Sequence, residues 1–152
     1  MLVLCGKGTF DACRAEVEAL LQSGQAVVKL ADIVEAQGGD RRYIEDVSLF
    51  ETAHVLVPFT ASAAGFVAAM DAEGVGIAAA MLGAGRETVD DSIDYSAGIV
   101  FHKKTGDAVK PGDALATLHT GDINKVKPAL EKLEASITMA DTAPAILPLI
   151  YA

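Results

Sequence analysis

The 152-residue chain contains no tryptophan, and aromatic residues make up only 5% of it. Because aromatic side chains dominate the binding energy of many recognition surfaces, a flat surface built on them is not expected here. Basic residues are also few: 12 Lys and Arg stand against 21 Asp and Glu, which gives a formal net charge of −9. A surface of that sign repels phosphate backbones, so the composition disfavours nucleic-acid binding.

The sequence also lacks long apolar runs and targeting signals. No stretch approaches the roughly 18 apolar residues that cross a bilayer, and Met1–Cys5 is followed at once by GKG, with no basic segment before it. Cys5 and Cys13 form no CxxC pair and have no histidine at ligand spacing. We therefore expect two buried, reduced thiols, a cytoplasmic protein and no membrane partner.

The first fifty residues carry helical patterns. Apolar residues from Phe10 to Leu21 recur on one helical face, and Ser23-Gly24 marks the end of this helix. A second helix is predicted over residues 25–37. Its expected inward residues are Val27, Leu30 and Val34.

After residue 50 the pattern becomes mixed, which predicts an α+β fold: N-terminal helices, then strands with helices. Strands are expected within residues 53–59, 63–71, 96–104 and 114–120, and TGDAVKPGD before the last of them reads as a double turn. GVGIAAAMLGAGR predicts a helix that ends at Gly83 or Gly85. Residues 122–140 predict another, with Pro128 in its first turn and Val126, Leu130, Leu133 and Ile137 inward. The last nine residues, PAILPLIYA, predict a strand or an extended tail.

The glycines at 83 and 85 invite comparison with a phosphate-binding loop. Gly83-Ala84-Gly85 matches the start of G-x-G-x-x-G, but the third glycine position is Thr88. Glu87, Asp90 and Asp91 would repel a pyrophosphate, and the turn follows a helix where a dinucleotide loop follows a strand. The glycines are therefore interpreted as the C-terminal cap of a helix.

The other polar residues form no recognisable catalytic or metal-binding set. Asp90, Asp91 and Asp94 do not match a calcium loop, so we expect them to cap a turn or to form local hydrogen bonds. The histidines are each expected to be structural, since none has a partner at the spacing of a catalytic triad; they are His54, His102 and His119. Lys103-Lys104 is interpreted as a solvated strand end rather than a phosphate clamp.

The segment GIVFHKKTGDAVKPGDALATL is similar to half of a biotinyl or lipoyl domain, with its barrel-sandwich arrangement. A carrier of that kind needs a modifiable lysine at a hairpin tip, but here the second strand is followed by HTGDIN. The next lysine, Lys125, is expected in or beside a helix. A stand-alone binding or carrier module is kept as the alternative function, and intact mass after expression with a biotin or lipoate ligase would test it.

Taken together, three motifs resemble the C-terminal domain of pyrimidine-nucleoside phosphorylases, thymidine phosphorylase included. They are LGAGR, then D-x-I-D-x-x-x-G, then K-x-G-D-x-V-x-x-G-x-x-L-A-x-x-H. MLVLCGK at the start and AQGGD at residues 36–40 also resemble this family. The resemblance implies an α/β-hammerhead, barrel-sandwich-like domain over residues 51–152, preceded in 1–50 by helices from the end of the larger α/β lobe.

For the whole enzyme, the resemblance implies phosphorolysis: phosphate attacks the anomeric carbon of a pyrimidine nucleoside and releases the base and a pentose 1-phosphate. It further implies a homodimer, and we expect no cofactor or metal. The family's Lys-x-Ser-x-Gly-Gly phosphate loop, its Ser-Gly-Arg…Thr-Gly-Gly-Thr-x-Asp signature and its base-binding segment have no counterpart here. We therefore assign no catalytic, cofactor-binding or metal-binding residue, and expect the chain to be inactive without the N-terminal portion of such an enzyme.

Two further expectations concern surfaces. In the larger enzyme Met1–Cys5 would pack against the missing lobe, so in the isolated chain it should either expose apolar side chains at a frayed N-terminus or associate with another chain in a non-native dimer. The loop His119–Lys125 joins a strand to a helix, and loops on rigid scaffolds often carry functional contacts. Either it approaches the active cleft of the larger enzyme, or it is an ordinary connection with Asp122 as a helix cap.

Overall fold

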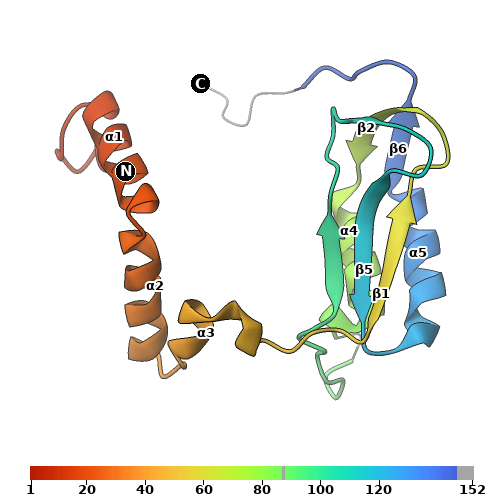
Figure 1. Cartoon of the computed structure of the whole chain (residues 1–152), viewed down its shortest axis with the longest axis horizontal. Helices are drawn as coiled ribbons and strands as arrows, with labels where there is room; N and C mark the ends of the chain where they lie inside the picture. The colour runs from red at the N-terminus through yellow and green to blue at the C-terminus, as the bar shows by residue number, and fades with distance from the viewer. Residues whose placement is uncertain (87, 147–152) are drawn as a thin grey trace. The chain divides into compact units, whose positions relative to one another are not determined.

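The structure is a computed structural model that describes residues 1–86 and 88–146. The chain forms two compact units, Met1–Phe50 and the part from Glu51 onward, and each is described by itself (Figure 1). Glu87 and most of the predicted C-terminal strand or tail, residues 147–152, lie outside the described residues. The observed mixture of helices with two small antiparallel sheets confirms the α+β class.

Unit 1 is helical: α1 spans Phe10–Gln22, α2 Gln25–Ala36, α3 Arg42–Glu45 and the short 3-10 helix η1 Val47–Leu49. The N-terminus of α1 is capped by Thr9, whose hydroxyl accepts a hydrogen bond from the Ala12 N–H at 3.3 Å. The two helices predicted before residue 38 are thus confirmed. No helix among the described residues is long and apolar enough to cross a membrane.

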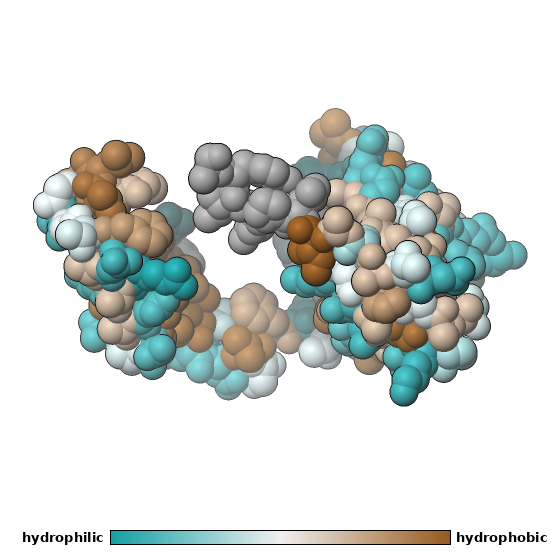
Figure 2. Space-filling view, turned by 90° about the horizontal axis from the view of Figure 1, so that it is seen from above, coloured by the Kyte–Doolittle hydropathy of each residue, from teal (hydrophilic) through white to brown (hydrophobic). Residues whose placement is uncertain are grey.

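Unit 1 buries very little of its apolar surface. Only Cys13 and Ala31 are buried, and Figure 2 shows hydrophobic side chains at the surface of this unit. The prediction that Val27 and Leu30 point inward is wrong, because two short helices supply no second layer to cover that face. Cys5 is exposed and free, so only Cys13 fits the predicted buried thiol. The expected exposure of Met1–Cys5 is confirmed.

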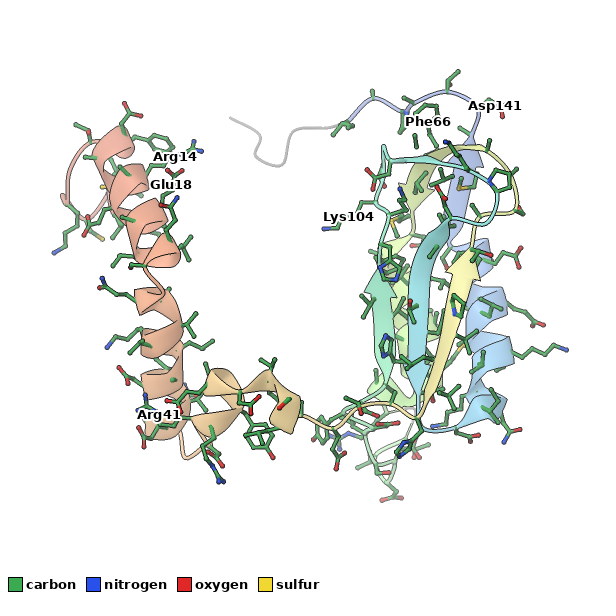
Figure 3. All side chains as sticks on the ribbon, in the orientation of Figure 1. Arg14, Glu18, Arg41, Phe66, Lys104 and Asp141 are labelled. Atoms are coloured by element: carbon green, nitrogen blue, oxygen red, sulfur yellow. The ribbon has the colours of Figure 1, made fainter. Side chains whose placement is uncertain are left out.

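A charged cluster around Arg41 joins α2 to α3. The Arg41 guanidinium lies 3.1 Å from the Glu35 carboxylate, 2.9 Å from that of Glu45 and 3.7 Å from that of Asp32 (Figure 3). The hydrogen bonds to Glu45 and Glu35 raise the pKa of Arg41 above its ordinary value, and the bond to Glu45 is the largest cause. Exposed ion pairs contribute little individually, so the cluster orients the two helices more than it stabilises them.

The first sheet of unit 2 has the antiparallel order β1-β5-β3, with β1 at Val55–Thr60, β5 at Ala114–Thr120 and β3 at Gly98–Phe101. Val57 pairs with Leu118 in the register of β1 and β5, and Pro58 lies in the middle of the edge strand β1. β3 and β5 lie within the predicted ranges, and β1 extends one residue beyond its predicted range, to Thr60. Along β5, Ala116 and Leu118 face one core cluster, and Leu115 is buried in a second cluster with Val67 and Val109.

The second sheet has the order β4-β2-β6, with β4 at Ala108–Val109, β2 at Gly65–Met70 and β6 at Ile137–Ala140. The prediction that a helix continues through residue 140 is therefore wrong. The helix stops at Ser136, and Ile137 and Thr138 enter a ladder with β2 (Ile137 opposite Met70). β-branched residues favour that pleated environment over a last helical turn.

Two helices cover one face of the first sheet (Figure 1). They are α4, Ala72–Ala79, which runs into the π-helical turn η2, Ala80–Ala84, and α5, Val126–Ala135, which follows the 3-10 turn η3, Ile123–Lys125. Their buried side chains form one cluster with β5: Ala78, Leu82, Ala116, Leu118, Ala129 and Leu133. Pro128 lies in the first turn of α5, as predicted.

Two tetrapeptide turns flank β4 and have the same construction. In Lys104–Asp107 and in Lys110–Asp113, the Asp N–H donates to the Lys C=O at 3.0 Å, and the Asp carboxylate accepts from the Lys N–H. The first turn is fastened to Val67 by two main-chain hydrogen bonds and the second to Ala61 in the same manner. The predicted double turn is confirmed, although its short strand β4 was not foreseen.

Two glycines of α4 provide a matched test of helix packing. A Cβ on Gly74 would collide with the Ser136 hydroxyl and lie 2.7 Å from Asp71 Oδ2, whereas a Cβ on Gly76 meets nothing within 4 Å. We expect Gly74→Ala to lower the free energy of unfolding by about 1–3 kcal/mol through overpacking. Gly76→Ala should raise it by up to about 1 kcal/mol, since alanine is the better helix former. Urea denaturation would measure both, and equal effects would contradict this account of α4.

Candidate functional site

The carboxylate of Asp94 joins distant parts of unit 2. Its Oδ1 accepts hydrogen bonds from the Ser96 N–H at 2.9 Å and from the Ser96 hydroxyl at 2.6 Å, and its Oδ2 accepts from the Gly121 N–H at 3.1 Å. The Asp94 N–H in turn donates to the Gly83 C=O at 3.0 Å. One aspartate thus connects the turn after α4, its own loop and the turn after β5.

A second set of bonds reinforces the same junction. The fully buried Thr120 hydroxyl donates to the Leu82 C=O at 2.7 Å and accepts from the Asp122 N–H at 3.2 Å. The Asp122 carboxylate accepts from the N–H and from the side-chain amide of Asn124, both at 2.9 Å, and so caps η3. We call the resulting surface the Asp94 edge: residues 82–86, 88–97 and 120–125.

Two hollows lie at the Asp94 edge. The first, of about 390 Å³, is lined by Glu51, Thr52, His54, Asp94, Ser96 and Gly121. The second, of about 300 Å³, is lined by Ala80, Met81, Gly83, Gly85, Asp91, Ser92 and Lys125. Lys125 reaches the turn after α4: a Cβ placed on Gly83 would lie 3.3 Å from its Nζ.

The predicted roles of the glycines and aspartates fit this geometry. Helix α4 and its continuation end around Gly83 and Gly85, which confirms the interpretation of these glycines as a helix stop. Asp91 accepts from the Thr88 N–H at 2.8 Å within a turn, and Asp94 makes the expected local bonds to Ser96. The bond from Gly121 to Asp94 spans 27 residues and was missed, since no local pattern signals it.

The basic and imidazole side chains do not converge on one centre. His102 bonds the Thr117 hydroxyl at 2.8 Å, His119 lies on β5, and the exposed His54 lines the first hollow. Lys104 is exposed at its turn, in agreement with a solvated strand end, whereas Lys103 is half-buried and its Nζ donates to the Ala108 C=O at 3.4 Å. Lys125 ends η3, beside α5 as predicted. Among residues 1–86 and 88–146, no group of three or more His, Cys, Asp or Glu is arranged to hold a metal.

Hydrogen bonding lowers the pKa of Asp94 below its ordinary value. The Ser96 hydroxyl is the largest cause, followed by the Ser96 N–H, and the Gly121 N–H adds a smaller contribution. A depressed folded-state pKa means that this stabilisation is present above the unfolded pKa and is lost as the pH falls through the folded value. The pH window in which it disappears therefore lies below about pH 4.

We expect Asp94→Asn to lower the free energy of unfolding at neutral pH by about 1 kcal/mol, since Asp94 is partly exposed. The difference from the unsubstituted chain should shrink below about pH 4, where Asp94 becomes protonated. Urea denaturation across that range would measure it. Asp90→Asn, at an exposed carboxylate on the same loop, is the control. If the difference in free energy of unfolding between the two proteins is the same at every pH, the charge of Asp94 does not contribute to stability.

Residues 66–140 match the family described as pyrimidine nucleoside phosphorylase C-terminal domain. Three curated relatives carry the name pyrimidine-nucleoside phosphorylase. The enzyme of Staphylococcus haemolyticus (strain JCSC1435) is 38% identical over 138 residues, 90% of this chain and 32% of its own length. The enzyme of Bacillus subtilis (strain 168) is 38% identical over 146 residues, which are 95% of this chain and 34% of that enzyme. The enzyme of Staphylococcus aureus (strain USA300) is 37% identical over 144 residues, which are 93% of this chain and 33% of that enzyme. The chain spans about one third of the length of these relatives.

Proposed function

This chain corresponds to the C-terminal portion of the enzymes in the pyrimidine-nucleoside phosphorylase family. From that premise we propose that it is the scaffold domain of such an enzyme. The larger enzyme cleaves pyrimidine nucleosides with phosphate, releases the free base and a pentose 1-phosphate, and acts as a homodimer. The observation that carries the proposal is the match of residues 66–140 together with identities of 37–38% over nearly the whole chain.

The charge at the Asp94 edge supports a role without direct phosphate chemistry. A site that stabilises a transferring phosphate needs clustered cations or N–H donors aimed at it. Here Glu51, Asp91 and Asp94 line the two hollows, against one lysine, Lys125. The Gly121 and Ser96 N–H groups already donate to Asp94. We therefore assign phosphate binding and base binding to the other portion of the enzyme, and no catalytic residue to this chain.

The proposal extends to domain architecture. Residues 1–50 belong to the end of the larger α/β lobe, and residues 51–152 form an α/β-hammerhead domain with a barrel-sandwich-like core. The paired turns support this assignment: each is fastened by the same two kinds of main-chain bond, one to Ala61 and the other to Val67. That repetition is typical of a sandwich whose two halves are built alike. The sparse burial in unit 1 supports its assignment to a larger lobe.

An activity assay on two proteins tests the function. The purified chain alone should release no uracil or thymine from uridine or thymidine in the presence of phosphate. A chimera in which this chain replaces the matched C-terminal third of the Bacillus subtilis enzyme should release base in a phosphate-dependent reaction. Base release by the chain alone would refute the scaffold assignment. A folded chimera without activity would refute the family function.

A further inference from the structure

Three large apolar side chains are exposed at the Asp94 edge. Val89 is 89% exposed, Tyr95 87% and Ile123 61%. They lie on neighbouring loops: Tyr95 stands between Asp94 and Ser96, and Asp94 is bonded to Gly121, two residues before Ile123. Asp91 and Ser92 line the same hollow as Lys125, so the Val89 turn also belongs to this end of unit 2. Apolar side chains gathered this way on a domain surface mark an interface.

The loops that carry these side chains are held by specific hydrogen bonds. The turn around Val89 is closed by the Thr88 N–H bonded to Asp91, Tyr95 is flanked by the Asp94–Ser96 bonds, and Ile123 opens a helical turn capped by Asp122. An aromatic or aliphatic anchor on such a pre-ordered loop loses little conformational entropy on binding. The edge thus has the construction of a docking surface.

The charge of the edge specifies its partner. The residues of the edge carry the acids Asp90, Asp91, Asp94 and Asp122 against the bases Arg86 and Lys125, and Glu51 lines the hollow that Asp94 also lines. A complementary surface presents basic groups around apolar sockets, and charge complementarity of this kind sets orientation and excludes other partners.

The path of the chain identifies which molecule carries that surface. The polypeptide enters unit 2 through Glu51 and Thr52, which line a hollow of the Asp94 edge together with Asp94 and Gly121. The relatives have about two thirds of their length beyond the region that this chain matches. A portion tethered at this end meets the edge at high effective concentration, so a modest contact area suffices.

Resting on the proposed function, we propose that the Asp94 edge is the surface on which the catalytic portion of the same enzyme docks, with Val89, Tyr95 and Ile123 as anchors. The partner is a basic surface with apolar sockets, supplied by the polypeptide that precedes this region in the full-length enzyme. The loop His119–Lys125 then acts through this interface, whereas the outer face of the β1-β5-β3 sheet has no part in it.

Hydroxyl-radical footprinting of the isolated chain and of the Bacillus subtilis chimera tests the docking surface directly. Tyr95 should be oxidised at least about fivefold more slowly in the chimera, as expected for a buried anchor. Met139, on the other sheet and 39% exposed, is the internal reference and should react at the same rate in both proteins. Equal oxidation of Tyr95 in both proteins, with an active chimera, overturns this inference and leaves the proposed function standing.

Matched substitutions supply the second measurement. Tyr95→Asp and Ile123→Asp should each reduce kcat/KM of the chimera by about tenfold or more, because they bury a charge in an apolar socket. Val100→Asp, at a 51% exposed position on the β1-β5-β3 sheet, should stay within about twofold. Circular dichroism melting of the isolated variants checks that each is folded, and Val89→Asp replaces any that is not. Equal losses at Tyr95 and Val100 count against the inference, whereas an inactive unsubstituted chimera with a protected Tyr95 counts against the proposed function alone.

Discussion

Leu133→Ala should lower the free energy of unfolding by about 2–5 kcal/mol. Leu133 is fully buried on α5 and packs in the cluster that contains Leu82 and Leu118. Its removal leaves a cavity between α5 and the β1-β5-β3 sheet, because the flanking helix and strand cannot close over three missing carbon atoms without moving. Urea denaturation monitored by hydrogen exchange at the β5 amides would report the loss.

Leu56→Ala provides the control for that experiment. Leu56 has the same side chain and belongs to the same unit, but it is 57% exposed on β1. Its truncation removes little buried surface and creates no cavity, so we expect a cost of about 1 kcal/mol or less. If the two variants lose the same stability, the α5–sheet cluster is not the core of this unit.

The second large effect is expected for Gly83→Ala. Gly83 has a φ of +116° and a ψ of −1°, a backbone conformation that a residue with a Cβ adopts only at a cost of about 1–3 kcal/mol. An added Cβ would also lie 3.2 Å from the Asp94 Cβ and 3.3 Å from Lys125 Nζ. Strain and crowding act together, so we expect a loss of about 2–4 kcal/mol in urea denaturation. Displacement of Asp94 should also abolish the protection of the Gly121 amide against hydrogen exchange.

Gly112→Ala separates the two contributions. Gly112 has a φ of +87° in the second tetrapeptide turn, but a Cβ there meets nothing within 4 Å. Only the backbone cost should appear, about 1–2 kcal/mol, with no change at Gly121. A loss at Gly112 as large as at Gly83 would mean that crowding beside Asp94 contributes nothing.

The sequence predicted the parts of this fold that depend on local patterns. Helical periodicity located α1 and α2, and a short run of residues that follows the double turn located β5 at Ala114–Thr120. The boundary between α5 and β6 was missed, because Ile137 suits an amphipathic helix and the strand forms only through pairing with β2. Val27 and Leu30 were assigned to a core from periodicity alone, which states that a face is apolar but not what covers it.

In the candidate site, too, local contacts could be predicted from the sequence and long-range contacts could not. Turn chemistry predicted the roles of Asp91 and Asp122, which bond to residues two or three positions away. The Asp94–Gly121 bond joins residues 27 positions apart, and Lys125 Nζ lies beside Gly83, about forty positions earlier in the chain. Such contacts arise when tertiary packing brings two turns together, so a single sequence carries no periodic signal for them.

Pro58, in the middle of the edge strand β1, has a consequence for the molecule in concentrated solution. Unpaired edges are templates on which a strand of another molecule can add, and continued addition produces fibrils. Proline has no N–H to donate and is accepted in sheets where its nitrogen faces away from the neighbouring strand. An incoming strand therefore meets a gap in the donor pattern halfway along β1. Pro58 thus protects this edge of the sheet against aggregation.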